Sequence, residues 1–272
     1  MRFSQVDVFS SEPLLGNPVA VVHDADGVSD EEMAGFARWT NLSETTFLLT
    51  PTVAGADYRL RIWTPGGELP FAGHPTLGSA HAWLEAGGVP AGDDLVQECG
   101  AGLVTIRRTS DRLAFAAPPL TRSGPVDAAD VAGICRALRI TEPDIVETTW
   151  IDNGPGWVGV LLGDADAVLG IDPDWAAFGD LKIGVVGPYA DGPLAVEVRA
   201  FCPGYGMPED PVTGSLNAGI GQWLAGGRLP SSYVASQGTV LQRAGRVHVG
   251  LEGDTVWVGG DTRTTVTGSV DL

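Results

Sequence analysis

A motif that occurs twice constrains the fold of this chain more than any other feature. Residues 201–215 (FCPGYGMPEDPVTGS) contain one copy, and residues 70–79 (PFAGHPTLGS) contain a shorter one. When 74–79 (HPTLGS) is set over 210–215 (DPVTGS), the offset is 136 residues, half of the 272-residue chain. A repeat at half the chain length indicates two related structural units. The sequence therefore predicts two similar lobes.

The remaining pattern favours many short strands and one long helix in each half. Alternating or β-rich runs predict strands at 6–9, 18–22, 45–49, 58–63, 103–107, 113–116, 157–162 and 194–201, with closing strands among 239–242, 247–251, 255–259 and 264–270. Helices are expected at 31–39, after a capping box of Ser29 and Glu32, at 75–84, at 127–138, and behind Pro211 to about 224. The predicted fold class is α+β, because a single mixed sandwich explains the repeat poorly.

The proline-rich stretch 118–125 is the best candidate for a linker between the lobes. We expect an N-terminal lobe of residues 1–118, completed by a C-terminal strand at about 263–272, and a C-terminal lobe of residues 119–262. A composition of 44% hydrophobic and 18% charged residues is typical of a folded protein with a substantial core.

The chain is strongly acidic, with a formal net charge of −18 and a pI near 4.4. Nucleic acid binding requires a basic surface, so a nucleic acid partner is not expected. No apolar run is long enough to span a bilayer, and residues 1–9 alternate like a strand and lack the apolar block of a signal peptide. These features predict a cytoplasmic protein with no membrane partner.

The number and spacing of cysteines and lysines limit the disulfides, metal sites and cofactors that the chain can hold. The cysteines Cys99, Cys135 and Cys202 are widely spaced and form no C-x-x-C pair, which argues against a disulfide framework or a structural zinc site. Lys182 is the only lysine, and its surroundings are typical of a loop and strand. Pyridoxal phosphate and Schiff-base enzymes need a reactive lysine amine. We therefore expect neither a cofactor nor a metal.

Each motif copy places a polar residue, His74 or Asp210, directly before a proline. Proline is favoured at the first helical position, so this polar residue is predicted to be the N-cap of a helix. A helix N-terminus carries unpaired N–H groups and about half a positive charge, so it can hold an anion. Two such ends facing one another across a cleft would hold a small carboxylate without lysine or metal. The simpler structural interpretation is an ordinary helix cap, with the Gly-Ser pair permitting tight packing.

Four blocks match one known family in its order: 16–22 (GNPVAVV), 41–45 (NLSET), 71–78 (FAGHPTLG) and 209–215 (EDPVTGS). With these blocks the chain resembles the PhzF (phenazine biosynthesis-like) family over both halves. The resemblance implies the diaminopimelate epimerase-like fold, in which two pseudo-symmetric lobes each wrap a sheet around a central helix. It also implies an active site between the lobes, and a homodimer.

The best understood reaction of that family is the isomerisation of trans-2,3-dihydro-3-hydroxyanthranilate, a proton shift without a cofactor. The resemblance implies that Glu44 is the general acid/base, with His74 and Asp210 beside it as further catalytic residues. The residues implied to hold the substrate carboxylate or to line the pocket are Ser43, Gly73, Gly214 and Ser215. A carboxyl group that takes a proton from one carbon and returns it to another can perform both halves of such a reaction.

The chain departs at one point from the epimerases that share this fold. Those enzymes carry a catalytic cysteine at each helix start, whereas the matching loops 72–74 and 210–211 contain none. Two-base racemisation through thiols is therefore not expected. Cys202 is interpreted as a buried, small apolar residue, and His81 as a packing residue without a metal.

The leading hypothesis is a cofactor-independent isomerase acting on a small amino or hydroxy carboxylic acid, often an unsaturated one, in specialised metabolism of the antibiotic type. One alternative is an epimerase, racemase or dehydratase acting on a related amino acid. Another is a non-catalytic protein that binds small acids. Side chains near Tyr205, Met207 and Trp63 are expected to line a pocket for an apolar or conjugated substrate body.

Overall fold

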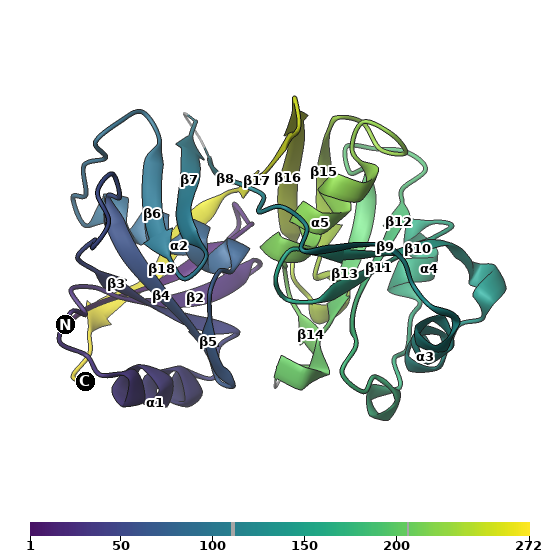
Figure 1. The fold of residues 1–272 in the computed structure, drawn as a ribbon, viewed down its shortest axis with the longest axis horizontal. Helices are drawn as coiled ribbons and strands as arrows, with labels where there is room; N and C mark the ends of the chain where they lie inside the picture. Colours follow the sequence, from purple (N-terminus) through teal and green to yellow (C-terminus); the bar gives the residue numbers. More distant parts are fainter. Residues whose placement is uncertain (110–111, 206) are drawn as a thin grey trace. The chain divides into compact units, whose positions relative to one another are not determined.

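The chain divides into two compact units. The computed structural model describes residues 1–109, 112–205 and 207–272, with the backbone alone for Tyr205. Unit 1 comprises Met1–Ala116 and Gly259–Leu272, and unit 2 comprises Ala117–Val258. Figure 1 shows both units as ribbons coloured along the chain. Gly206, within the second motif copy, lies outside the described residues.

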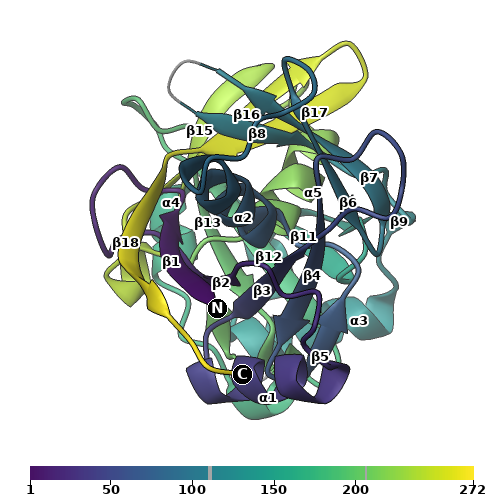
Figure 2. The same ribbon diagram turned by 90° about the vertical axis from the view of Figure 1, so that its left-hand side faces the viewer.

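Unit 1 wraps its strands around one central helix, α2 (Gly73–Glu85). Its strands are β1 (Arg2–Val8), β2 (Asn17–Val22), β3 (Glu44–Leu49), β4 (Tyr58–Thr64), β5 (Gly67–Leu69), β6 (Leu95–Cys99), β7 (Gly102–Arg108), β8 (Leu113–Ala116) and β18 (Thr262–Ser269). Strands β2 and β3 pair in parallel, as do β4 and β6, and the other neighbours within the unit are antiparallel. Figure 2 faces this unit and shows α2 surrounded by strands.

Unit 2 repeats this connection pattern around a second central helix, α5 (Gly214–Leu224). Its strands are β9 (Arg122–Pro125), β10 (Ile145–Asp152), β11 (Trp157–Leu162), β12 (Lys182–Pro188), β13 (Val196–Phe201), β14 (Glu209–Asp210), β15 (Ser232–Gln237), β16 (Gly245–Glu252) and the start of β17 (Thr255–Gly260). Here β11 and β12 pair in parallel, as do β13 and β15. The order of antiparallel and parallel pairings therefore repeats between the units, as the sequence repeat predicted.

The outer helices are short and begin at polar caps. Among the described residues they are α1 (Asp30–Thr40) in unit 1, and α3 (Ala128–Leu138) and α4 (Ala165–Leu169) in unit 2. Unit 2 also contains 3₁₀ turns at Glu142–Asp144, Trp175–Ala177, Pro203–Tyr205 and Thr239–Leu241. The predicted capping box of α1 is present, with Ser29 and Glu32 bonding each other's backbone. Asp127 caps α3 through the Asp130 N–H group.

The two central helices are buried on nearly all sides, so small residues are needed where strands approach them closely. A Cβ atom at Gly78 of α2 would lie 2.3 Å from Val19 Cγ1 on β2. A Cβ atom at Gly219 of α5 would lie 2.7 Å from the Ile151 carbonyl oxygen on β10. Glycine at these positions lets each sheet close around its helix.

Both motif helices begin at positions that differ from the prediction. Helix α2 begins at Gly73 with Ala72 as its N-cap, so His74 lies inside the first turn. Proline is tolerated there because the first N–H groups of a helix have no intrahelical acceptor. Helix α5 begins at Gly214 with Thr213 as its N-cap, and Asp210 lies on strand β14. The prediction that His74 and Asp210 are N-caps is therefore wrong.

One further expectation needs correction. Residues 122–125, within the expected linker, form strand β9, which pairs with β10. Of the four segments offered for closing strands, three form strands and residues 239–241 form a 3₁₀ turn. Trp63 packs into the hydrophobic cluster beneath α1 with Phe36 and Phe47. Strand alternation explains this, because Trp63 pairs with Thr45 on the α1 side of the sheet.

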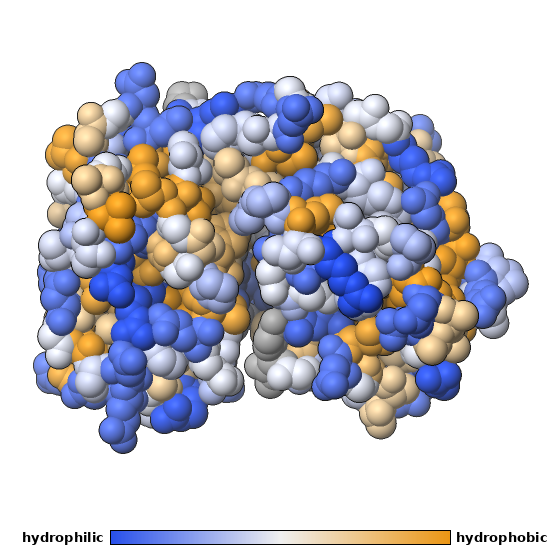
Figure 3. Space-filling model, in the orientation of Figure 1, coloured by the Kyte–Doolittle hydropathy of each residue, from blue (hydrophilic) through white to orange (hydrophobic). Residues whose placement is uncertain are grey.

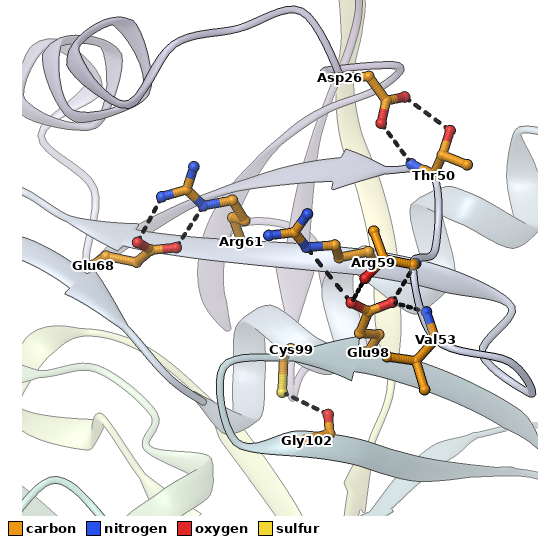
Figure 4. Close-up of polar contacts among 10 residues, drawn as sticks. Asp26, Thr50, Val53, Arg59, Arg61, Glu68, Glu98, Cys99 and Gly102 are labelled. Carbon is orange, nitrogen blue, oxygen red and sulfur yellow. Dashed lines mark hydrogen bonds and ion pairs between the residues drawn. The ribbon is translucent and has the colours of Figure 1, made fainter.

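Polar side chains are interspersed with apolar ones on the visible surface of each unit (Figure 3). In unit 1, strands β4 and β5 carry a two-point ion pair in which Arg61 donates to both carboxylate oxygens of Glu68 at 2.6 and 2.7 Å (Figure 4). Within the described parts of the chain, no helix has the length and apolar character needed to cross a membrane.

Candidate active site

Glu44 and His74 meet inside unit 1. Glu44 is the first residue of β3, and its neighbour on β2 is Val19. Strand alternation directs Glu44 to the same face as Thr46, whose hydroxyl contacts Ser79 on α2 at 2.8 Å. Glu44 Oε2 lies 3.4 Å from His74 Nε2, with the side chains 14% and 3% exposed. The structure thus brings together two of the three predicted catalytic residues.

The imidazole of His74 is held in its neutral form. Burial lowers the pKa of His74 to about 3, although a hydrogen bond with the Pro18 carbonyl acts in the opposite direction. The other ring nitrogen, Nδ1, lies 3.3 Å from the Asn17 side-chain amide. The contact between His74 and Glu44 is therefore that of a neutral imidazole with a carboxyl group, and not an ion pair near neutral pH.

The turn that carries Asn17 is fixed by the backbone. The Gly16 N–H group donates to Asp7 Oδ2 at 3.1 Å, and a Cβ atom at residue 16 would lie 2.2 Å from the Val8 carbonyl oxygen. Only glycine fits at this position. The first matching block therefore positions the amide of Asn17 against His74, a role that the sequence did not reveal.

Glu209 and Asp210, adjacent in unit 2, have separate roles. Strand β14 pairs with β13, so that Phe201 faces Glu209 and Ala200 faces Asp210. Glu209 accepts two hydrogen bonds of 2.8 Å from Arg199, and the two side chains are only 7% and 3% exposed. Both carboxylate oxygens of Glu209 therefore form a buried ion pair that holds strand β14 in place. Asp210 Oδ2 accepts a 2.6 Å bond from the Thr213 hydroxyl.

A buried glutamine holds the turn between Asp210 and α5. Gln237 Oε1 accepts 2.9 Å bonds from the Thr213 N–H group and from the Asn217 side chain. Gln237 Nε2 donates to the Asp210 carbonyl at 3.1 Å and to the Thr213 hydroxyl at 2.9 Å. All polar atoms of this amide are therefore used on one turn. Sequence reasoning missed Gln237, because only the parallel pairing of β15 with β13 brings it close.

The start of α5 presents hydrogen-bond donors. The Asn217 N–H group makes the first intrahelical bond, to the Thr213 carbonyl at 3.1 Å. The N–H groups of Gly214 and Ser215 precede that bond, so they are suited to an anion. Ser215 Oγ accepts a 3.0 Å bond from the Trp157 indole, and its carbonyl accepts one of 2.9 Å from Asn153. Neither Trp157 nor Asn153 was identified from the sequence.

The other predicted site residues lie beside these groups along the chain. Gly73 is the buried first residue of α2, and Ser43 directly precedes β3. His81 contacts Thr262 Oγ1 at 3.0 Å and Glu85 at 3.3 Å, which agrees with its interpretation as a packing residue. Cys202 is 3% exposed. Among the described residues, no group of three histidine, cysteine or acidic side chains could hold a metal ion.

Residues 6–270 match the family model described as phenazine biosynthesis-like protein. The chain belongs to this family. It is 36% identical to antisense-enhancing sequence 1 of Schizosaccharomyces pombe, over 98% of this chain and 97% of that one. It is 35% identical to a trans-2,3-dihydro-3-hydroxyanthranilate isomerase of Pseudomonas aeruginosa, over 93% and 91% of the two chains.

Among solved structures, a PhzF-family protein from Enterococcus faecalis matches with a TM-score of 0.80 at 25% identity. The match covers 100% of this chain and 99% of that one. The family resemblance and the α+β, diaminopimelate epimerase-like fold inferred from the sequence are thereby confirmed.

Proposed function

We propose that this PhzF-family chain is an isomerase that shifts a proton on a small amino or hydroxy carboxylic acid, with Glu44 as the general acid/base. The contact between Glu44 and the neutral imidazole of His74 carries the proposal. The relative from Pseudomonas aeruginosa, whose name is that of such an isomerase, supports the reaction class and the type of substrate.

In the proposed reaction, Glu44 as carboxylate removes a proton from one carbon of the substrate. The electron pair of that C–H bond moves into the conjugated system, and the double bonds shift. The proton on the Glu44 carboxylic acid exchanges with water, because this side chain is 14% exposed. Glu44 then delivers a proton to another carbon, so the enzyme returns to its starting state and no oxidant or cofactor is consumed. General acid/base groups of this kind contribute about 10²- to 10⁴-fold in rate.

His74 supports this cycle because it is neutral. A protonated imidazole 3.4 Å from Glu44 would favour the charged carboxylate throughout, which would hinder the return of the proton. A neutral imidazole contacts the carboxyl group without that bias. In this proposal the donors of Gly73, Gly214 and Ser215 hold the substrate carboxylate, Ser43 lines the pocket, and Asp210 orients the substrate amino group.

The test uses trans-2,3-dihydro-3-hydroxyanthranilate, the substrate in the name of the bacterial relative. Glu44→Gln keeps the size of the side chain and removes its acid/base function, so kcat should fall about 10²- to 10⁴-fold. Glu31→Gln, at an exposed glutamate in the first turn of α1, is the matched control and should leave kcat unchanged.

Full turnover by the Glu44→Gln protein would contradict the assignment of Glu44. A product lighter by one water would instead identify a dehydratase, and a stereoisomer with unchanged connectivity would identify an epimerase. The homodimer, the cytoplasmic location and the role in specialised metabolism remain part of the proposal. Sedimentation equilibrium tests the dimer directly.

A further inference from the structure

The hydroxyl group of Ser215 is held on one side by an indole. Trp157 is the first residue of β11 and only 2% exposed, and its Nε1 atom lies 3.0 Å from Ser215 Oγ. Asp152 fixes the loop before Trp157, because its Oδ1 atom accepts 2.7 Å bonds from the N–H groups of Gly154 and Gly156. The indole therefore reaches Ser215 from a rigid support.

The chemistry of this pair determines the direction of its hydrogen bond. An indole N–H group can only donate, whereas a serine hydroxyl has one proton and two acceptor lone pairs. In this contact Ser215 must therefore accept, and its own proton remains available for another acceptor. Asn153 binds the Ser215 carbonyl at 2.9 Å and so fixes the backbone of the same residue.

The matching serine of unit 1 has the opposite arrangement. Ser79, at the 136-residue offset from Ser215, lies 2.8 Å from Thr46 Oγ1. Thr46 donates its only hydroxyl proton to the Ala20 carbonyl at 3.2 Å, so Ser79 is the donor to Thr46. The Ser79 proton is thus used inside the protein, and Ser79 is completely buried.

We propose that Trp157 is a positioning residue that makes Ser215 a hydrogen-bond donor to the substrate carboxylate. The inference rests on the proposed function, in which Ser215 binds that carboxylate. Trp157 does not touch the substrate in this account. Its N–H group occupies a lone pair of Ser215 and leaves the hydroxyl proton directed to the anion, together with the N–H groups that begin α5.

The test measures binding of two probes by calorimetry: anthranilate, which carries a carboxylate, and anthranilamide, which has a neutral amide in its place. Trp157→Phe removes the indole N–H group and keeps an aromatic ring. It should weaken anthranilate binding about fivefold, and Ser215→Ala should weaken it about tenfold, the range expected for the net contribution of one hydrogen bond. Anthranilamide should lose less affinity than anthranilate in both variants, because its neutral amide oxygen accepts a weaker hydrogen bond than a carboxylate does.

Trp150→Phe is the matched control. Trp150 is a second buried tryptophan of unit 2, and its indole nitrogen has no hydrogen-bond partner among the described residues. This variant should leave anthranilate binding unchanged. The double variant should bind anthranilate about as weakly as Ser215→Ala alone. Without the Ser215 hydroxyl, the indole N–H group of Trp157 has no hydroxyl to orient.

Three results would overturn the inference: wild-type affinity for anthranilate in Trp157→Phe, equal losses for both probes, or independent effects of the two substitutions. Failure of the wild-type protein to bind millimolar anthranilate would overturn it as well. These outcomes are distinct from failure of the proposed function. Absence of turnover would reject the isomerase, but the calorimetric comparison would still test the role of Trp157. If turnover is measured, Trp157→Phe should increase KM at nearly constant kcat.

Discussion

Helices α2 and α5 begin in two copies of one motif, yet their first turns are built differently. Gly73, the first residue of α2, aligns with Glu209, whereas α5 begins only at Gly214, five residues later. In unit 1 the early start places His74 on the helix and against Glu44. In unit 2 the late start leaves Asp210 on a strand. The same sequence pattern thus presents an imidazole in one unit and a carboxylate in the other.

The strands beside these helices differ in charge as well. Strand β3 begins with Glu44, and β12, at the equivalent place in the pairing order, begins with Lys182. Lys182 lies on the strand face of Gly184, where a Cβ atom would lie 2.1 Å from Leu216 of α5. In the proposed function, Glu44 of unit 1 is the proton-transfer group, and Gly214 and Ser215 of unit 2 are donors to the substrate carboxylate.

The largest expected effect concerns the ion pair that holds Asp210 on its strand. Glu209→Leu would leave Arg199 buried without its carboxylate partner, so the free energy of unfolding should fall by about 3–5 kcal/mol. Glu68→Leu is the matched change in unit 1, where the Arg61–Glu68 pair has the same two-point geometry but side chains 16% and 37% exposed. That change should cost about 1 kcal/mol or less.

Urea denaturation of both variants gives the comparison, with the midpoint and slope fitted together. Equal losses of stability in the two units would contradict the view that burial distinguishes the two pairs.

The next effect is the pH dependence of stability due to His74. Its pKa is about 3 in the folded protein and 6.5 in the unfolded chain, so the unfolded state binds more protons between these values. Stability should therefore fall as the pH decreases from 6.5 toward 3. His74→Gln should remove up to about 3 kcal/mol of the loss between pH 6.5 and pH 4.

Denaturation curves at several pH values check this prediction. Equal acid sensitivity of the wild-type and His74→Gln proteins would mean that the pKa of His74 is not lowered in the folded protein. Burial also lowers the pKa values of His23 and His81, which contribute to the acid sensitivity of both proteins. The effect of His74 is therefore the difference in acid sensitivity between the wild-type and His74→Gln proteins.

The smallest effect separates the two motif serines. Ser215→Ala should raise KM for trans-2,3-dihydro-3-hydroxyanthranilate about tenfold with little change in kcat, because it removes a donor to the carboxylate. Ser79→Ala should leave KM unchanged and lower stability by about 1 kcal/mol, since it removes one internal hydrogen bond. Steady-state kinetics and thermal denaturation of both variants measure the two effects. Equal increases in KM for the two variants would mean that Ser79 and Ser215 do not differ in their contribution to substrate binding.

Local sequence signals predicted the parts of the fold that depend on near neighbours. The Ser29 capping box and the end of α5 at Leu224 are examples, because caps and helix breakers act within a few residues. The repeat likewise indicated two units, and the structure divides into two units between Ala116 and Ala117.

Long-range pairing determined what the sequence did not reveal. The late start of α5 depends on Gln237, which binds Thr213 from a strand 24 residues away. The orientation of Ser215 depends on Trp157, 58 residues earlier. Neither residue belongs to a motif block, so no local pattern identifies it. The resemblance selected Glu44 and His74, but the neutral state of His74 follows only from its burial.

The most direct test of the division between the units follows the transferred proton in heavy water. With saturating trans-2,3-dihydro-3-hydroxyanthranilate, the wild-type and Ser215→Ala proteins should both incorporate deuterium into the product carbon that is protonated, whereas Glu44→Gln should incorporate none above the uncatalysed rate. Mass spectrometry and proton NMR measure the label and its position. Incorporation by Glu44→Gln at the wild-type rate, or its loss in Ser215→Ala alone, would contradict the account.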